Sequence, residues 1–268
     1  MGQVFWVFTI DGDWDEYFRI KLPEARRRPD TARLEQLVRA EIELAKVING
    51  RFVHFVHSSP LVPSFFFQPQ FIALWQQIEV GGGEIGVHCH EEDLYLAWYY
   101  DNQARMEKAI TRQVEKFREN GLTPRCYRGG FMTFSPKTIP ILEESGVFLD
   151  FSCEPGRHLV TNGQLVSDWQ GAPENLYRMA YEDHRKPGGS NIMEVPLGIY
   201  VERQSLWSIW QKARKIKRRP GKQIVSVLAH TYDFASWQMK LKIRLALLLL
   251  KRYGKFINCR QVLAEAAK

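Results

Sequence analysis

Strand-like and helix-like segments alternate along almost the whole chain, and this alternation most constrains the fold. A clear helix begins at Asp30 or Thr31 and ends at Asn49-Gly50, and another runs from about Asn102 to Asn120-Gly121. A third opens at Ser135-Pro136 and ends at Gly146. Apolar strand-like runs separate the helices, at 4–8, 52–56, 84–87, 147–151, 192–197 and 224–228. The pattern predicts an α/β fold in which helices surround a parallel sheet or barrel.

Aspartate and histidine side chains stand at the ends of three of these strand-like runs. Asp11 and Asp13 end the first run, His88 and His90 end the third, and His230 follows the last. Residues two apart on a strand point to the same side. Each motif alone is weak, because a turn, a pair of surface histidines or a loop hydrogen bond explains it equally well. In a barrel, however, they would converge at one mouth, where such enzymes keep their chemistry.

A carboxylate with two imidazoles suits zinc or another divalent ion that keeps positions open for water and substrate. Such an ion lowers the pKa of its water and polarises a carbonyl oxygen. A free carboxylate can then take a proton, and an imidazole can give one to the leaving group. The residues alone therefore predict metal-assisted hydrolysis of an amide or an ester.

Five motifs resemble, in order, those of the polysaccharide deacetylases, carbohydrate esterase family 4. The resemblance spans nearly the whole chain and implies a single domain, residues 1–268, built as one distorted (β/α) barrel with about seven parallel strands. The motifs are Thr9-Ile10-Asp11-Gly12-Asp13, Glu84-Ile85-Gly86-Val87-His88-Cys89-His90, Tyr127-Arg128-Gly129-Gly130-Phe131, Leu149-Asp150-Phe151-Ser152 and Leu228-Ala229-His230-Thr231-Tyr232-Asp233.

The resemblance also implies roles for individual residues. Asp11 resembles the general base and Arg128 the arginine that orients it. His230 matches the general acid, and Asp233 is expected to hold its ring and tautomer. The residues expected to contribute to substrate binding are Tyr127, Gly129, Gly130 and Asp150.

The expected metal ligands are Asp13, His88 and a third residue at which the chain departs from the family. Most members have a second metal histidine four residues after the first, where this chain has Glu92. His90 can replace it, because in an extended segment it shares a side with His88. Glu92 can instead bind through its carboxylate, and failing both, metal binding would be weak or absent. We favour His90 because imidazole suits zinc better than a second carboxylate, with cobalt, nickel or iron as alternative ions.

Charge and apolar patterning bear on partners and location. The formal net charge is +7, and residues 212–222 alone carry seven positive and no negative charges. This segment can meet a phosphate or a membrane surface, although a solvated surface explains it equally well, and no nucleic-acid-binding motif accompanies it. There is no signal peptide pattern, and the longest apolar run, Leu245–Leu250, is too short to span a membrane and fits the last helix of the domain. Four scattered cysteines fit buried positions in a reducing compartment. We expect a cytoplasmic protein, with peripheral contact at the inner membrane face through residues 212–222.

The function expected from these features is removal of an acetyl or formyl group from an N-acylated sugar, glycan precursor or glycolipid. Two alternatives stay open: hydrolysis of a C–N bond outside sugars, and a metal-free barrel that binds glycan without turnover. His54 and His57 follow the second strand and can touch the site, but histidines so placed are more often structural. Residues 154–191 lack lasting periodicity and predict a long ordered excursion of the kind that forms binding walls.

Overall fold

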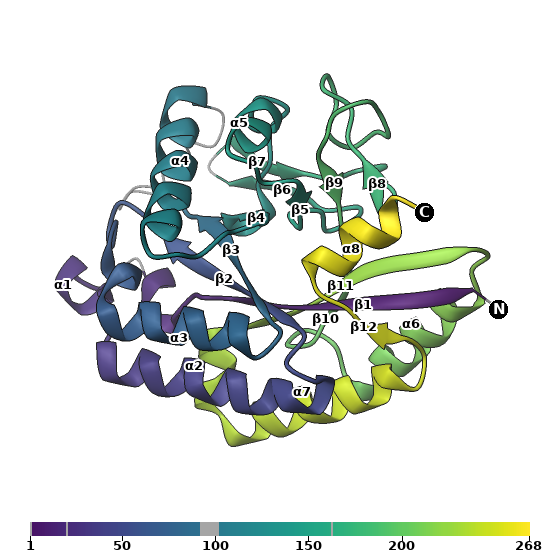
Figure 1. The fold of residues 1–268 in the computed structure, drawn as a ribbon, viewed down its shortest axis with the longest axis horizontal. Helices are drawn as coiled ribbons and strands as arrows, with labels where there is room; N and C mark the ends of the chain where they lie inside the picture. The colour runs from purple at the N-terminus through teal and green to yellow at the C-terminus, as the bar shows by residue number, and fades with distance from the viewer. Residues whose placement is uncertain (1, 20, 92–101, 162) are drawn as a thin grey trace.

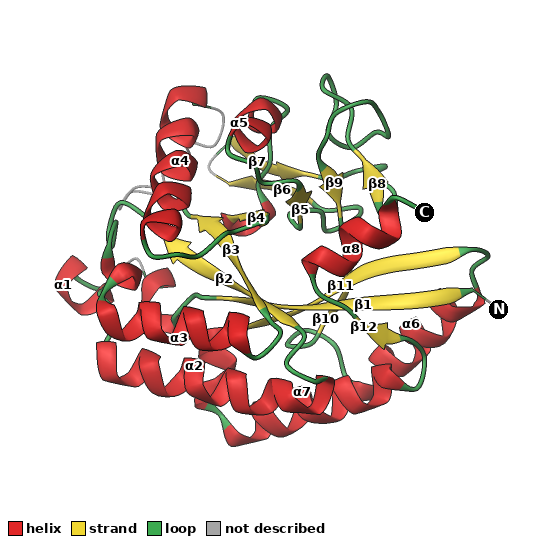
Figure 2. Ribbon diagram, viewed as in Figure 1, coloured by secondary structure: helices red, strands yellow, loops and turns green. Residues whose placement is uncertain are grey.

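The computed structural model of the chain describes residues 2–19, 21–91, 102–161 and 163–268. In this part of the chain, ten strands form one curled sheet (Figures 1 and 2). Eight are parallel, in the order β10-β11-β1-β2-β3-β4-β5-β9; β8 is antiparallel to β9, and β12 pairs with β1. Their bounds are β1 Gln3–Asp11, β2 Phe52–Ser58, β3 Glu84–Cys89, β4 Cys126–Gly129, β5 Leu149–Asp150, β8 Tyr177–Arg178, β9 Met193–Glu194, β10 Leu197–Tyr200, β11 Lys222–His230 and β12 Lys255–Phe256.

Residues 193–200 connect the two edges of the parallel sheet. The segment pairs with β5 at its start, where Val195 N–H donates to the carbonyl of Asp150. Pro196 interrupts it, and its end pairs with β11. If this segment is counted as one strand with a break, it is the seventh parallel strand of a distorted barrel. The other six are β1, β2, β3, β4, β5 and β11. The predicted fold class is therefore confirmed.

Helices cover the outside of the strands, and α2, α6 and α7 lie along one side of β1 and β11 (Figures 1 and 2). The predicted N-cap Asp30 is present in α2, and Asn102, where a helix was expected to begin, caps α4 through its side chain. The helix expected to open at Ser135-Pro136 begins at Thr138 instead, without a side-chain cap. The helices are α1 Glu24–Arg27, α2 Thr31–Ala45, α3 Pro69–Val80, α4 Gln103–Glu119, α5 Thr138–Glu144, α6 Leu206–Arg218, α7 Trp237–Lys251 and α8 Cys259–Ala266. Short 3-10 helices occur at η1 Asp15–Phe18, η2 Lys46–Ile48, η3 Phe65–Phe67, η4 Gly130–Met132 and η5 Thr231–Ala235.

One expectation about the helices was wrong. The apolar run Leu245–Leu250 lies in α7, but α7 is not the last helix, because α8 follows β12. Cys259 and Val262 of α8 pack into the inner core together with Phe5 at the start of β1. Therefore α8 covers the amino-terminal end of the barrel and leaves the carboxyl end for the site.

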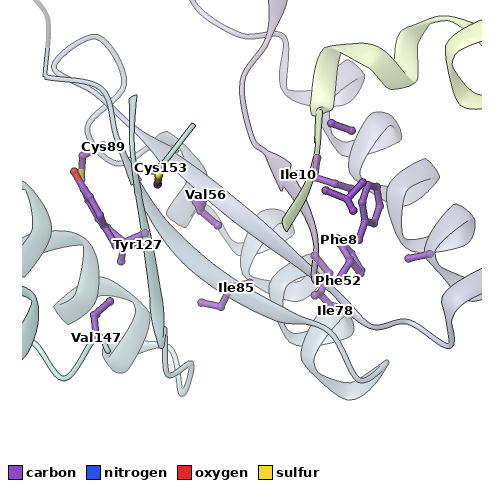
Figure 3. Close-up of a cluster of buried hydrophobic side chains, with 14 of the residues drawn as sticks. Phe8, Ile10, Phe52, Val56, Ile78, Ile85, Cys89, Tyr127, Val147 and Cys153 are labelled. Atoms are coloured by element: carbon purple, nitrogen blue, oxygen red, sulfur yellow. The ribbon is translucent and has the colours of Figure 1, made fainter. Parts of the chain in front are cut away.

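The strands have two apolar faces. Alternate residues such as Phe5, Val7 and Phe55 form the core inside the barrel. The residues between them face the helices; Figure 3 shows Phe8 and Phe52 of this outer layer beside Ile78 of α3. This alternation decides which polar side chains at the strand ends can reach the mouth. The inner positions at the carboxyl ends are occupied by Asp11, His57, His88, Arg128 and His230.

The excursion at residues 154–191 contacts both ends of the barrel: residues 167–169 lie against the mouth, whereas the N–H of Leu176 donates to the carbonyl of Ile224 near the start of β11. It contains an antiparallel hairpin of β6, His158–Thr161, and β7, Gln164–Asp168. Ser167 and Trp169 both donate hydrogen bonds to the carbonyl oxygen of Met132 at 2.7 Å. The excursion thus supports a turn that lines the site.

Two further findings concern the cysteines and the membrane. All four cysteines are free and buried. Among the described residues, no helix is both long and apolar enough to cross a membrane.

Candidate active site

A cavity of about 200 Å³ opens at the carboxyl ends of the strands. The structure brings five of the sequence-predicted residues together in its lining: Asp11, Asp13, His88, His90 and His230. All five are at least nine-tenths buried. Asp11 ends β1 directly beside His230 at the end of β11, and His88 pairs with Arg128 across β3 and β4. Parallel register is therefore what assembles residues from distant parts of the chain.

Gly12 allows the two aspartates to sit at this point. Its N–H donates to the carbonyl of Phe55 at 2.8 Å, and a Cβ at Gly12 would lie 2.7 Å from that oxygen. Any other residue would push the end of β1 away from β2. The chain leaves the strand after Asp11, so Asp13 lies just beyond β1 and turns into the cavity.

Asp13, His88 and His90 present their polar atoms to one another. The Nε2 atoms of His88 and His90 are 3.1 Å apart. His88 Nε2 lies 3.5 Å from Asp13 Oδ2, and His90 Nε2 lies 3.5 Å from Asp13 Oδ1. Ligand atoms of a tetrahedral ion with bonds of about 2.1 Å are separated by roughly 3.4 Å. The three side chains thus fit a divalent ion in both chemistry and spacing. Glu92, the alternative third ligand, lies outside the described residues.

His57 is a neighbour of this group that the sequence reasoning left aside. Its Nδ1 lies 2.7 Å from Asp13 Oδ1, and its ring stacks on His90 with centroids 4.8 Å apart. Asp13, His57 and His90 also form a group whose polar atoms all lie within 4.8 Å of one another. His57 Nε2 is buried without a hydrogen-bond partner among the described residues. His57 therefore orients the carboxylate that the ion would need.

The electrostatics of this group follow from burial and from neighbouring histidines. Burial lowers the pKa of His57 to about 4, although its hydrogen bond to Asp13 works in the opposite direction. Burial would raise the pKa of Asp13, but the charges of His90 and His88 and the hydrogen bond from His57 hold it well below its ordinary value. A neutral His57 and an ionised Asp13 fit a site for a cation.

Asp11 is held by a buried arginine. Arg128 Nη1 donates to Asp11 Oδ1 at 2.5 Å. The same guanidinium donates through Nη2 to Thr9 Oγ1 and through Nε to the carbonyl of Phe151, each at 3.0 Å. Phe55 packs against its face, with the guanidinium carbon 4.7 Å from the ring centre. Arg128 and all of these partners are buried, so the orientation of Asp11 is restrained.

His230 lies between two tyrosines, beside Asp11. Its ring stacks on Tyr232, with centroids 4.7 Å apart, and its Nε2 lies 3.4 Å from the hydroxyl of Tyr200 and 4.0 Å from Asp11 Oδ2. Glu202 Oε2 is 3.7 Å from Nδ1. Asp233 accepts a hydrogen bond from the backbone N–H of His230 at 2.9 Å, and burial raises its pKa to about 6.

Glu202 is therefore a second residue that the sequence reasoning missed. Asp233 acts on the backbone of His230, whereas Glu202 faces the ring nitrogen. Tyr232 also donates a hydrogen bond to Glu202. No motif marked Glu202, because it follows β10 in a turn and approaches His230 only through the pairing of β10 with β11.

The four residues predicted to bind substrate lie behind the wall of the cavity. Tyr127 points to the outer layer and is buried near Cys89 (Figure 3). Asp150 is fully buried and accepts a hydrogen bond from the Ser152 hydroxyl, which in turn accepts one from Gly129 N–H. Burial raises the pKa of Asp150. None of these four residues lines the cavity, so their part in substrate binding stays a prediction.

The turn that follows β4 is strained and does line the cavity. Phe131 and Met132 have φ angles of 55° and 61°, a region that bulky side chains rarely adopt. The Phe131 ring contacts His90 edge-on, with centroids 5.2 Å apart. Gly129 is needed for the turn, because a Cβ there would lie 1.8 Å from the carbonyl oxygen of Thr133. Gly129 and Gly130 thus shape a wall, and strain of this kind is typical of functional sites.

His54 and Trp169 proved structural. His54 Nδ1 lies 2.7 Å from the buried Glu41, and its ring stacks on Trp75. Glu41 also accepts a hydrogen bond from Thr231, so this network supports the loop that carries His230. Trp169 is fully buried.

Comparisons with known proteins place this geometry in a known fold. No protein-family model and no curated protein sequence matches the chain. A Mycobacterium smegmatis protein assigned as a polysaccharide deacetylase superposes with a TM-score of 0.65 at 16% identity, over 97% of this chain and 89% of that one. A Pseudomonas aeruginosa protein assigned likewise gives 0.62 at 11%, over 98% and 90%. A carbohydrate esterase family 4 pseudoenzyme from Bacillus anthracis gives 0.53 at 10%, over 97% and 65%.

The chain therefore has the fold of the polysaccharide deacetylases and of carbohydrate esterase family 4. This confirms, for the fold, the resemblance that the five motifs predicted. At these identities the likeness concerns architecture, and the chemistry has to be argued from the side chains.

Proposed function

We propose that this protein is a metal-dependent hydrolase that removes an acyl group from an N-acylated sugar. The observation that carries the proposal is the pairing of an arginine-held carboxylate with an imidazole across one cavity. Asp11 and His230 face each other there, with Asp13, His88 and His90 at the same mouth. We further propose that residues 1–268 work as one catalytic domain, since β1 and β12, from the two ends of the chain, pair in one sheet.

The residues divide the proton transfers between them. Asp11 takes a proton from the attacking water, and Arg128 fixes the direction of the accepting oxygen. His230 gives a proton from Nε2 to the leaving nitrogen, while Glu202 near Nδ1 stabilises the charged ring. A divalent ion held by Asp13, His88 and His90 would supply water activation and carbonyl polarisation. Zinc suits this ligand set, and cobalt, nickel or iron are the alternatives to test.

The shape of the surface favours a glycan. The cavity shares Glu154 and Tyr200 with a neighbouring groove of about 440 Å³, which also contains Gln204, Ser208 and Gln211. Hydrogen-bonding side chains beside aromatic rings suit sugar hydroxyls and ring faces. We propose that the groove holds the rest of a glycan whose acylated unit occupies the cavity. Tyr127, Gly129, Gly130 and Asp150 would contribute by supporting the turn that carries Phe131.

A glycan-binding protein without turnover is the rival function. One protein of this fold is described as a pseudoenzyme, and a mutant of it as having restored enzymatic activity, so the fold is compatible with both. The side chains support the enzyme. A pure binder needs neither a base with its aligning arginine nor an acid opposite them.

The test combines metal content with turnover. Elemental analysis of the wild type and of His88→Ala, His90→Ala and Glu92→Ala identifies the ligands. Turnover is measured with a chitin tetrasaccharide and with 4-methylumbelliferyl acetate, before and after loading with zinc, cobalt, nickel or iron. We expect Asp11→Asn and His230→Ala each to lower kcat by about 10²- to 10⁴-fold. Asp15→Asn, an exposed aspartate four residues from Asp11, is the matched control and should change nothing.

The outcomes separate the three functions. Turnover of a simple N-acetyl amide, added as a further probe, but of no acylated sugar would favour a C–N bond outside sugars. Bound metal with no turnover of any probe, or equal loss in the Asp15→Asn control, would contradict the proposed enzyme and leave the glycan binder.

A further inference from the structure

The exposed face of α7 is apolar. Trp237, Leu241, Leu245 and Leu248 are 67%, 47%, 42% and 42% exposed. Their spacing of four, four and three residues places them in one stripe along the helix. The opposite face already packs into the core through residues such as Ile243 and Leu247. The exposed part of this stripe lies outside the core, and a contiguous exposed apolar patch marks an interaction surface.

The two helices on this side of the barrel are basic, although Lys212, Lys215 and Arg219 line the neighbouring groove, where Arg219 pairs with Glu174. Residues 206–219 and 237–252, which contain α6 and α7, hold eleven lysines and arginines and no aspartate or glutamate. The formal net charge of the whole chain is +7, so the remainder is net negative. The two helices contact each other along one side of the barrel (Figure 1). On α6, Trp207 is 63% exposed and stacks on Trp210 with centroids 4.4 Å apart.

We propose that this face docks onto the surface of an anionic phospholipid bilayer. Trp and Leu on a basic helix are the combination that lies in the membrane interface, with rings and leucines among the acyl chains and cations against lipid phosphates. A second copy of the chain would bring two basic surfaces together, so charge argues against a dimer. We call this surface the membrane face; it comprises Trp207, Trp237, Leu241, Arg244, Leu245 and Leu248.

The membrane face begins at the rim of the candidate active site. Arg203 and Tyr232 line the cavity, and they lie four and five residues before Trp207 and Trp237. Docking would therefore hold the cavity close to the lipid surface. If the protein is the hydrolase proposed above, this docking implies that its substrate is an acylated glycan carried on a lipid.

Flotation with vesicles tests the docking without any substrate. The probes are vesicles of phosphatidylcholine alone and of phosphatidylcholine with about one-third phosphatidylglycerol. We expect the wild-type protein to float with the anionic vesicles, and to do so less as salt rises. The triple variant Leu241→Ser, Leu245→Ser, Leu248→Ser should lose at least tenfold in partitioning. The charge variant Arg218→Glu, Arg244→Glu should lose about as much, because Arg218 is exposed on α6 and Arg244 is exposed on α7.

Matched controls use exposed residues on other faces. Val80→Ser with Leu165→Ser removes exposed apolar side chains away from α6 and α7, and Lys108→Glu with Arg112→Glu reverses two charges on α4. Both controls should bind vesicles as the wild type does, and thermal unfolding should show that every variant is folded.

Three results would overturn the proposal. They are absence of flotation by the folded wild type, equal loss in the controls, and a wild-type dimer in sedimentation velocity that the leucine variant converts to monomer. Turnover of a water-soluble acylated sugar is measured in parallel. If the soluble sugar is turned over but flotation fails, only the membrane face is wrong. If the protein floats but turns over neither the soluble sugar nor an acylated glycolipid in the anionic vesicles, only the proposed hydrolase is wrong.

Discussion

Replacing Arg128 by methionine should destabilise the protein strongly, because Asp11 would stay buried without its cation. Arg128 is fully buried and Asp11 is 3% exposed, with 2.5 Å between the donor and the acceptor. Removing one partner of a buried ion pair costs about 3 to 5 kcal/mol. In a chain of this length, that loss corresponds to a fall in melting temperature of about 10 °C.

A double-mutant cycle with Asp11→Asn isolates the pair. The double variant has no unpaired charge, so we expect it to be more stable than the two single losses predict, with a coupling of about 2 kcal/mol. Denaturant unfolding measures all four free energies. Arg27→Met is the matched control: Arg27 is also buried, but it donates to the carbonyl of Tyr17, and its loss should add independently to Asp11→Asn. A cost below about 1 kcal/mol for Arg128→Met, or additivity with Asp11→Asn, would refute the reasoning.

Three further changes test other parts of the molecule. His57→Ala should weaken zinc binding about 10- to 100-fold in a chelator competition, with partial recovery in His57→Asn, because Asp13 loses its orienting donor; unchanged affinity would rule out that role. Burial lowers the pKa of His184 from 6.5 to about 4, so the unfolded chain binds more protons between these values. The stability due to a neutral His184 is then fully present above pH 6.5 and falls by about 3 kcal/mol towards pH 4. Denaturant unfolding at pH 7.5 and 4.5 measures it, and the same pH slope in His184→Gln would contradict this assignment. Trp169→Phe removes one of two donors to Met132 and should raise KM more than it lowers kcat, at a cost of about 1 kcal/mol in stability; an unchanged KM would separate the excursion from the site.

The sequence predicted the barrel and the main polar groups of its mouth because both depend on local pattern. The strand ends at Asp11, His88 and His230 can be recognised from the sequence. Because the carboxyl ends of parallel strands lie at the same end of a barrel, these residues are expected to meet there. The helix α3 was not predicted. The signal was present in the sequence, because four of its buried residues, Phe71, Leu74, Trp75 and Ile78, stand at the i, i+3, i+4 and i+7 spacing of a helical stripe. Glu202 depends on the pairing of β10 with β11, which no local pattern encodes.

His57 shows where a pattern of single residues stops being informative. In Phe52-Val53-His54-Phe55-Val56-His57 both faces of the strand are buried, so apolar and polar residues do not alternate. The two histidines are three residues apart and must therefore point to opposite faces. Which of them points inward follows only from pairing, which sets Phe55 beside Asp11 and His57 beside His88. Given that register, His57 joins Asp11 and His88 on the inner face and His54 is left to Glu41 and Trp75 in the helical layer. Glu92 stands where the resembling family has its second metal histidine. Such a departure is thus a reason to search the neighbouring strand ends for histidines that point into the barrel.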